Sequence, residues 1–340
     1  MPKSDTVGSR KTLDVVIIGC GMIAGGHDES RQGDEILSHA GAYSCHPGYR
    51  IRACIDPNRE RRRRFKERWG VEKAFADLDQ CLADGLSFDV ASVAAPTAAH
   101  AAILRRLLET PVKAVFCEKP LTGDAAETRR IVKSYAAARL PLAVNYFRRY
   151  DSAIQRLKRE IDEGTWGALQ WACGFYGKGI LHNGSHMVHL MQYLFGTLKP
   201  LAVLRARTDY EAADPTLDAI LATGAEAPIH LIGSDSRHYN VFEACLAFER
   251  GQIVLEEGMR VVRVRPVSDD PLYPGHRHLG RGRRRKGAQG RALLRAVDDL
   301  YRSVTGGAPL ASGGDAALAA EEVCSRMQEM ARASRVTRVP

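Results

Sequence analysis

The stretch "LDVVIIGCGMIAGG" (residues 13–26) decides the fold class of this 340-residue chain. It begins as a continuous apolar run, typical of a strand buried on both faces of a parallel sheet, and the run ends at a glycine. The next residues follow the pattern GxGxxA, in which the first glycine allows a tight turn, the second lets a pyrophosphate approach the backbone, and the alanine lets helix and strand pack closely. This pattern predicts a strand–loop–helix unit that binds the phosphates of a dinucleotide at the helix N-terminus; a purely structural glycine turn is the alternative. The candidate cofactor-binding residues here are Gly19, Gly21, Met22, Ile23 and Ala24.

Four further apolar segments repeat this type of strand, and helix-like segments separate them. The strands are expected at 49–56, 88–96, 111–120 and 140–147, and the helices at 57–69, 98–109 and 124–138. Strands that alternate with helices predict a doubly wound parallel sheet of the Rossmann type in an α/β protein. We expect this domain to span residues 13–150, after a loose polar tail at 1–12.

The order of predicted elements changes after residue 150, where strands outnumber helices. Strands are expected at 168–177, 201–210, 228–235, 241–258 (with a hairpin turn at 249–252) and 260–267, and helices at 151–163, 185–195, 289–304 and 315–334. A run of strands with few helices between them predicts a large, mostly antiparallel sheet. Residues 151–340 are therefore expected to form a C-terminal α+β domain.

The composition excludes several classes of function. No apolar run reaches the ~20 residues of a membrane span, and the polar start resembles no signal peptide, so we expect a cytoplasmic protein with no membrane partner. The eight cysteines form no CxxC pair, which favours reduced thiols over disulfides or zinc. The net charge of +9 is concentrated at 59–68, interpreted as a solvated helix face, and at 281–291, interpreted as a surface loop. Neither segment has base-stacking aromatics nearby, so no nucleic-acid partner is predicted.

Asp56 ends the second predicted strand, where a carboxylate can accept hydrogen bonds from ribose hydroxyls. It lies 37 residues beyond Gly19, whereas about 20 is usual, so residues 27–48 are interpreted as an extra loop and a short helix. Asp56 favours NAD because it would repel a 2′-phosphate, and the nearby Arg59 leaves NADP open. A helix cap before Pro57 is the structural alternative for this aspartate.

Polar residues also follow the next predicted strands, in "AAPTAAH" (94–100) and "CEKP" (117–120). In an open parallel sheet, ligands bind beyond the carboxyl ends of the strands. The candidates there are Pro96, Thr97, His100 and Glu118 beside the cofactor, and Lys119 as a donor to an oxygen that gains negative charge during hydride transfer. The alternative for Lys119 is an ordinary surface lysine.

The ordered set GxGxxA, Asp56, "PTAAH", "EKP", "NYFRRYD" (145–151) and "GSH" (184–186) resembles the Gfo/Idh/MocA oxidoreductases. The resemblance implies an NAD(P)-dependent dehydrogenase or reductase that acts on a secondary alcohol or ketone of a sugar, cyclitol or nucleotide sugar. It also implies a substrate domain whose open sheet mediates contacts in a homodimer or homotetramer. By this resemblance Lys119 polarises the substrate and His186 is the acid/base, while Arg148, His182 and Asn183 bind substrate. A non-catalytic dinucleotide-binding sensor of the same fold is the alternative function.

The segment "HNGSHMVH" (182–189) departs from the family pattern D-x-G-x-H-x-x-D, because His182 and His189 replace both aspartates. A metal site would need all three histidines on one helix face. We instead expect Asn183 or Ser185 to cap a helix, which leaves His182 outside it, and no nearby carboxylate or cysteine completes a zinc set. The sequence therefore predicts no metal, with His189 a structural residue bonded to a backbone carbonyl.

Overall fold

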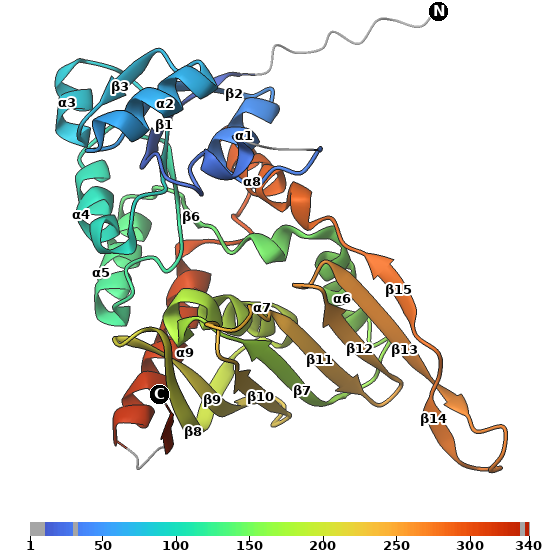
Figure 1. The fold of residues 1–340 in the computed structure, drawn as a ribbon. Helices are drawn as coiled ribbons and strands as arrows, with labels where there is room; N and C mark the ends of the chain where they lie inside the picture. The colour runs from blue at the N-terminus through green and yellow to red at the C-terminus, as the bar shows by residue number, and fades with distance from the viewer. Residues whose placement is uncertain (1–10, 30–32, 334–336, 340) are drawn as a thin grey trace, which may run out of the picture. The chain divides into compact units, whose positions relative to one another are not determined.

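The chain forms two compact units, each built from several segments (Figure 1). The computed structural model describes residues 11–29, 33–333 and 337–339, so the predicted tail lies almost wholly outside the described residues. Unit 1 comprises residues 1–118, 133–145 and 293–313, and unit 2 comprises residues 119–132, 146–292 and 314–340. The chain passes from unit 1 to unit 2 after residue 145, near the predicted boundary at 150, and it also changes unit at other points. One of these crossings lies between Glu118, the last residue of its segment in unit 1, and Lys119, the first residue of unit 2.

Unit 1 contains a six-stranded parallel sheet with the strand order β3-β2-β1-β4-β5-β6, which confirms the predicted Rossmann type. Its strands are β1 (Leu13–Ile18), β2 (Tyr49–Ile55), β3 (Lys73–Phe75), β4 (Val90–Val93), β5 (Ala114–Cys117) and β6 (Leu142–Val144). The helices along this part of the chain are α1 (His39–Cys45), α2 (Arg59–Trp69), α3 (Leu78–Ala83), α4 (Thr97–Leu107) and α5 (Ala125–Ala137), and α8 (Ala292–Gly306) joins them later. Every residue of β4 and β5 is buried, which explains their continuous apolar sequence. The short, half-buried β3 and the helix α3 were not predicted. With three and six residues, they are too short to show a clear periodicity of apolar residues.

The helix expected directly after the glycine loop is interrupted. About one turn forms, and then a short 3-10 helix (Gly26–Asp28) and a loop lead to α1. Yet α1 resumes the same hydrogen-bond ladder, because His39 N–H donates to the Ile23 carbonyl at 3.0 Å and Ala40 N–H to the Ala24 carbonyl at 2.8 Å. The prediction of a helix opening at once is therefore wrong. The described residues 25–29 and 33–38 lie in an insertion into that helix, which accounts for the long spacing to Asp56.

Unit 2 contains a ten-stranded mixed sheet with the order β14-β13-β12-β11-β7-β10-β9-β8-β16, with β15 paired to β13. Most pairs are antiparallel, as predicted, and only β7–β10 and β8–β16 among those described are parallel. The strands are β7 (Leu169–Tyr176), β8 (Leu198–Glu211), β9 (Asp214–Thr223), β10 (Pro228–Gly233), β11 (Glu243–Phe248), β12 (Gly251–Glu256), β13 (Val261–Asp269), β14 (Arg277–Leu279), β15 (Arg283–Lys286) and β16 (Thr337–Val339). The helices are α6 (Ser152–Asp162), α7 (Ser185–Phe195) and α9 (Gly314–Ala333), of which α7 and α9 pack on β8 and on each other.

The structure agrees with the prediction for one of the two basic segments and differs from it for the other. The segment 59–68 is the solvated face of α2, where Arg63 forms ion pairs with Glu60 and Glu67, as expected. The segment 281–291 was interpreted as a loop, which is wrong for Arg283–Lys286, because these residues form β15 at the edge of the sheet. Strands β9, β14 and β15 were all missed. No helix within the described ranges has the length and apolar character that crossing a membrane requires.

Candidate functional site

The glycine-rich loop after β1 has the geometry that a dinucleotide requires. Gly19 has a φ of +99°, and a Cβ there would lie 2.6 Å from the carbonyl group of Ala94, so glycine is needed at this residue. A Cβ on Gly21 would meet no heavy atom within 4 Å, so the backbone faces open space there. Met22 beside it is 59% exposed, whereas Ala24 is buried. The loop therefore fits a pyrophosphate lying against its backbone.

Asp56 closes the same loop from the end of β2. Its carboxylate is buried and accepts hydrogen bonds from the backbone N–H groups of Cys20 at 2.9 Å and Asn58 at 2.8 Å. Each oxygen retains lone pairs for a ribose hydroxyl. The cap of α2 is Asn58, whose side chain accepts from Arg61 N–H, so the helix-cap interpretation of Asp56 is wrong.

The carboxyl ends of β4 and β5 carry the remaining cofactor candidates of unit 1. Pro96 precedes α4, which begins at Thr97. His100 is buried, and its Nε2 lies 2.8 Å from the Ala95 carbonyl, so this ring holds the loop between β4 and α4.

Glu118 is held by a buried polar network that sequence reasoning missed. The fully buried His39 places Nε2 at 2.9 Å from Glu118 Oε1 and Nδ1 at 2.7 Å from Ser92 Oγ. The Asn145 amide donates to the same Glu118 oxygen at 2.6 Å. These contacts fix the direction of the carboxylate. No local signal marks His39, because its partners come from distant parts of the chain.

Lys119 begins the first segment of unit 2. Its ammonium donates to the His182 carbonyl at 2.5 Å. The bond from Lys119 to Pro120 is cis, and the next backbone N–H, of Leu121, donates to Glu321 on α9. Glu321 is buried and also accepts from the Thr128 hydroxyl at 2.6 Å, and burial raises its pKa. Glu321 therefore anchors the segment that carries Lys119, and the sequence did not indicate this role.

Residues Gly179–Gly184 form a π-helical turn that leads directly into α7. The predicted cap at Asn183 or Ser185 is wrong. The Asn183 amide donates to the Gly177 carbonyl at 3.1 Å, and the Ser185 hydroxyl donates back to the Leu181 carbonyl at 2.5 Å. His182 thus lies on the turn, not before it. Turns of this kind are rare and often occur at functional sites.

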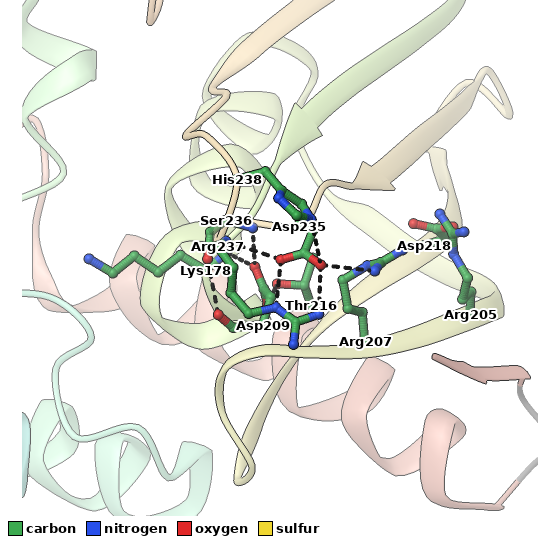
Figure 2. Close-up of polar contacts among 10 residues, drawn as sticks. All are labelled: Lys178, Arg205, Arg207, Asp209, Thr216, Asp218, Asp235, Ser236, Arg237 and His238. Atoms are coloured by element: carbon green, nitrogen blue, oxygen red, sulfur yellow. Dashed lines mark hydrogen bonds and ion pairs between the residues drawn. The ribbon is translucent and has the colours of Figure 1, made fainter. Parts of the chain in front are cut away.

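The hairpin of β8 and β9 holds the start of this turn. Asp209 accepts hydrogen bonds from the backbone N–H groups of Lys178 at 2.8 Å and Ser236 at 3.0 Å. Thr216 donates to Asp209 at 2.6 Å and accepts from Gly179 N–H at 2.8 Å. Figure 2 shows Asp209 among these contacts, with the Lys178 side chain extending away from them. The first N–H groups of a helical turn have no partner within the turn, and the hairpin supplies one.

His186 lies at the start of α7 and is 6% exposed. The rings of Tyr146 and Phe147 lie with their centroids 5.4 and 5.6 Å from its own. Burial holds the His186 pKa well below its ordinary value, and the charges of Lys119 and Arg148 lower it further. The ring is therefore neutral at neutral pH and can accept a proton.

Arg148 carries a buried charge beside this histidine. Its guanidinium carbon lies 3.8 Å from the ring centroid of Phe242 and 4.7 Å from that of Phe147. Nε and Nη1 are buried and have no hydrogen-bond partner. Burial lowers the Arg148 pKa to about 9, with a further contribution from Arg260. A buried cation without a counter-charge is costly, and such groups cluster at functional sites.

His189 is separate from these groups. It is buried and stacks on Tyr146 at 4.1 Å, and its Nε2 has no hydrogen-bond partner, so the expected bond to a backbone carbonyl does not form at this atom. The His182 ring instead lies 4.7 Å from that of Tyr210. Across the part of the chain that the structure describes, no three His, Cys, Asp or Glu side chains form a group that could hold a metal ion.

The parallel sheet and its glycine loop define unit 1 as a dinucleotide-binding Rossmann domain. Residues 13–146 match the Gfo/Idh/MocA model, described as an oxidoreductase family with an NAD-binding Rossmann fold. The resemblance seen in the sequence motifs is confirmed.

Curated relatives match parts of the chain. A myo-inositol 2-dehydrogenase from Thermotoga maritima is 32% identical over 34% of this chain and 34% of its own length. A D-apiose dehydrogenase from Paraburkholderia graminis is 26% identical over 65% of this chain and 60% of its own length. The chain thus spans between a third and three-fifths of these relatives. The same fold occurs in the crystal structure of an oxidoreductase from Agrobacterium radiobacter in complex with NAD+, L-tartaric acid and magnesium. The two structures superpose with a TM-score of 0.73 at 18% sequence identity, over 95% of this chain and 97% of the other.

Proposed function

We propose that this protein is an NAD-dependent dehydrogenase that oxidises a secondary alcohol of a sugar or cyclitol, or reduces the matching ketone. One observation carries the proposal. Unit 2 combines a lysine ammonium held on the His182 carbonyl with a buried, neutral His186, and the charge of Lys119 acts on that histidine. This pair can polarise an oxygen and move its proton.

In the oxidation direction, the neutral His186 ring takes the hydroxyl proton of the substrate. The Lys119 ammonium donates a hydrogen bond to the same oxygen as negative charge develops on it. Arg148, His182 and Asn183 orient the remaining hydroxyls. Bound NAD supplies the acceptor for the hydride that leaves the carbon.

The backbone of Gly19, Gly21, Met22, Ile23 and Ala24 would hold the pyrophosphate, and Pro96, Thr97, His100 and Glu118 would complete the cofactor site of unit 1. Asp56 would bind the ribose, and its buried carboxylate supports NAD as the preferred form over NADP, since it would repel a 2′-phosphate. The open space at Gly21 supports the same assignment.

A homodimer or homotetramer is also proposed, and light scattering of the purified protein tests it. Large apolar side chains are exposed on strands of the unit 2 sheet, at Trp171, Leu201, Leu204 and Ile232. Exposed apolar groups on a sheet favour association with another copy. A cytoplasmic location belongs to the same proposal, supported by eight cysteines that are all free.

The test is a panel of myo-inositol, apiose, other free sugars and nucleotide-linked sugars, each offered with NAD+ and NADP+ while the absorbance of the reduced cofactor is recorded. Turnover of a polyol or sugar with NAD+ supports the proposal. Tight NAD binding without turnover in either direction contradicts it and favours the non-catalytic sensor.

A further inference from the structure

A carboxylate from β9 lies directly behind the π-helical turn. Asp214, the first residue of β9, is 8% exposed. Its Oδ2 accepts the backbone N–H of His182 at 2.8 Å, and its Oδ1 accepts that of Leu181, also at 2.8 Å. Gln328 on α9 places its amide nitrogen 3.4 Å from Oδ1. A buried carboxylate with donors on both oxygens has a fixed orientation.

The main chain of His182 is held from both sides. Its N–H group donates to Asp214, and its carbonyl accepts the Lys119 ammonium. The N–H and carbonyl groups of His182 belong to the two peptide groups that meet at its Cα, so within a helical turn a contact that fixes the first restricts the direction of the second. The Lys119 ammonium is therefore linked to Asp214 through the main chain of His182, and the charges of the two side chains also act on each other.

The turn is shaped to fit this carboxylate closely. A Cβ on Gly179 would lie 2.1 Å from Asp214 Oδ2, and Gly179 has a φ of +78°, so only glycine lets the chain wrap around the carboxylate here. Burial raises the pKa of Asp214, and the N–H donors of Leu181 and His182 together with the charge of Lys119 oppose that shift.

We propose that Asp214 is a positioning residue for Lys119: its carboxylate fixes the main chain of His182, and the His182 carbonyl orients the lysine ammonium. The inference rests on the proposed function, in which Lys119 acts on the substrate oxygen. A displacement of the ammonium by about 1 Å would lower the rate on the order of 10²-fold.

The test compares Asp214→Asn with Asp209→Asn in the full-length protein. The two aspartates are matched, because Asp209 is 7% exposed, lies on the neighbouring strand and also accepts two backbone N–H groups, that of Lys178 just before the turn and that of Ser236 after β10. Asp214→Asn should lower kcat on the order of 10²-fold, raise the primary isotope effect of a deuterated substrate, and leave the Kd for NAD unchanged. Asp209→Asn should retain most of the wild-type kcat, even where both variants lower the melting temperature alike.

A second readout needs no turnover. The purified variants are acylated with acetic anhydride, and the modification of Lys119 is measured by peptide mass spectrometry against the exposed Lys133. Release of the ammonium from the His182 carbonyl should raise Lys119 labelling several-fold in Asp214→Asn, with no rise in Asp209→Asn and a smaller rise in the charge-preserving Asp214→Glu.

Equal losses of kcat in Asp214→Asn and Asp209→Asn would show that Asp214 is only structural and overturn the proposal. Unchanged labelling of Lys119 in Asp214→Asn, or in Asp214→Glu if the asparagine variant does not fold, would also overturn it. Should the wild-type protein turn over no substrate, the proposed function fails, but the labelling result still decides whether Asp214 holds Lys119 in place.

Discussion

Replacing Arg148 by methionine should stabilise the protein while it weakens catalysis. The guanidinium lies over two phenylalanine rings, its Nε and Nη1 are buried without a hydrogen-bond partner, and its pKa is lowered to about 9. At about 1.4 kcal/mol per pKa unit, the burial of this charge costs roughly 4–5 kcal/mol. The two cation–π contacts return about 1–2 kcal/mol, so Arg148→Met should increase the free energy of unfolding by roughly 2–4 kcal/mol.

Thermal unfolding checks the stability, and kcat/KM with the best substrate of the panel checks the catalysis. A gain of 1 kcal/mol raises the melting temperature of a domain of this size by about 2–4 °C. The gain should shrink above about pH 9, because Arg148 then loses its proton in the folded protein while the unfolded chain keeps it. Loss of a charged contact to the substrate should lower kcat/KM about 10–100-fold.

The control is Arg149→Met, in the same short 3-10 helix (Phe147–Tyr150) as Arg148, where the guanidinium stacks on Tyr193 at 4.4 Å and is half-buried. This variant should not gain stability. The reasoning is refuted if Arg148→Met melts at or below the wild-type temperature, or if it keeps full activity.

Three further predictions concern the chemistry and the cofactor. The kcat/KM for alcohol oxidation should stay level from about pH 8 down through pH 6.5, because the lowered pKa keeps His186 unprotonated there; an acid limb centred at 6.5 or above would contradict the burial of this ring. Asp56→Ser should shift the ratio of NADP to NAD affinity about tenfold toward NADP, because it removes the charge that repels the 2′-phosphate. Titrations with both cofactors measure this ratio. An unchanged ratio would show that Asp56 does not belong to the cofactor site. Gly21→Ala should weaken NAD binding while leaving the melting temperature near that of the wild type. Gly19→Ala should instead lower the melting temperature, because a Cβ there would lie 2.6 Å from Ala94. If the two variants changed the Kd for NAD and the melting temperature equally, Gly21 would face no ligand.

The strands of unit 1 could be predicted because a strand buried on both faces must be apolar throughout. The strands β1, β4 and β5 are the clearest examples, whereas β2 carries Arg50 and Arg52 and is continuously buried only over its last three residues. The interruption of the first helix could not be predicted in detail, since no local signal marks where the hydrogen-bond ladder that includes Ile23 and Ala24 resumes at His39. The strand β9 was missed for a different reason: its start, "DPT", reads as a turn, although Asp214 and Thr216 face the π-helical turn.

The sequence predicted which residues the candidate site contains. It did not predict the side chains that hold those residues in place. Lys119, His182 and His186 follow from motifs, and the structure places them in one unit. The absence of a carboxylate within "HNGSH" was read correctly from the sequence, but the carboxylate that contacts this turn comes from Asp214, on a strand that was missed. His39 and Glu321 were missed likewise, because each acts through partners that only the fold brings near.

The most direct test of the account is Lys119→Met, measured in a single turnover with enzyme in excess over substrate and with NAD affinity determined in parallel. Loss of the ammonium that stabilises charge on the substrate oxygen should slow hydride transfer by about 10²–10³-fold. The Kd for NAD should remain that of the wild-type protein, since the glycine loop and Asp56 belong to the other unit. Hydride transfer at the wild-type rate in Lys119→Met would contradict the central claim.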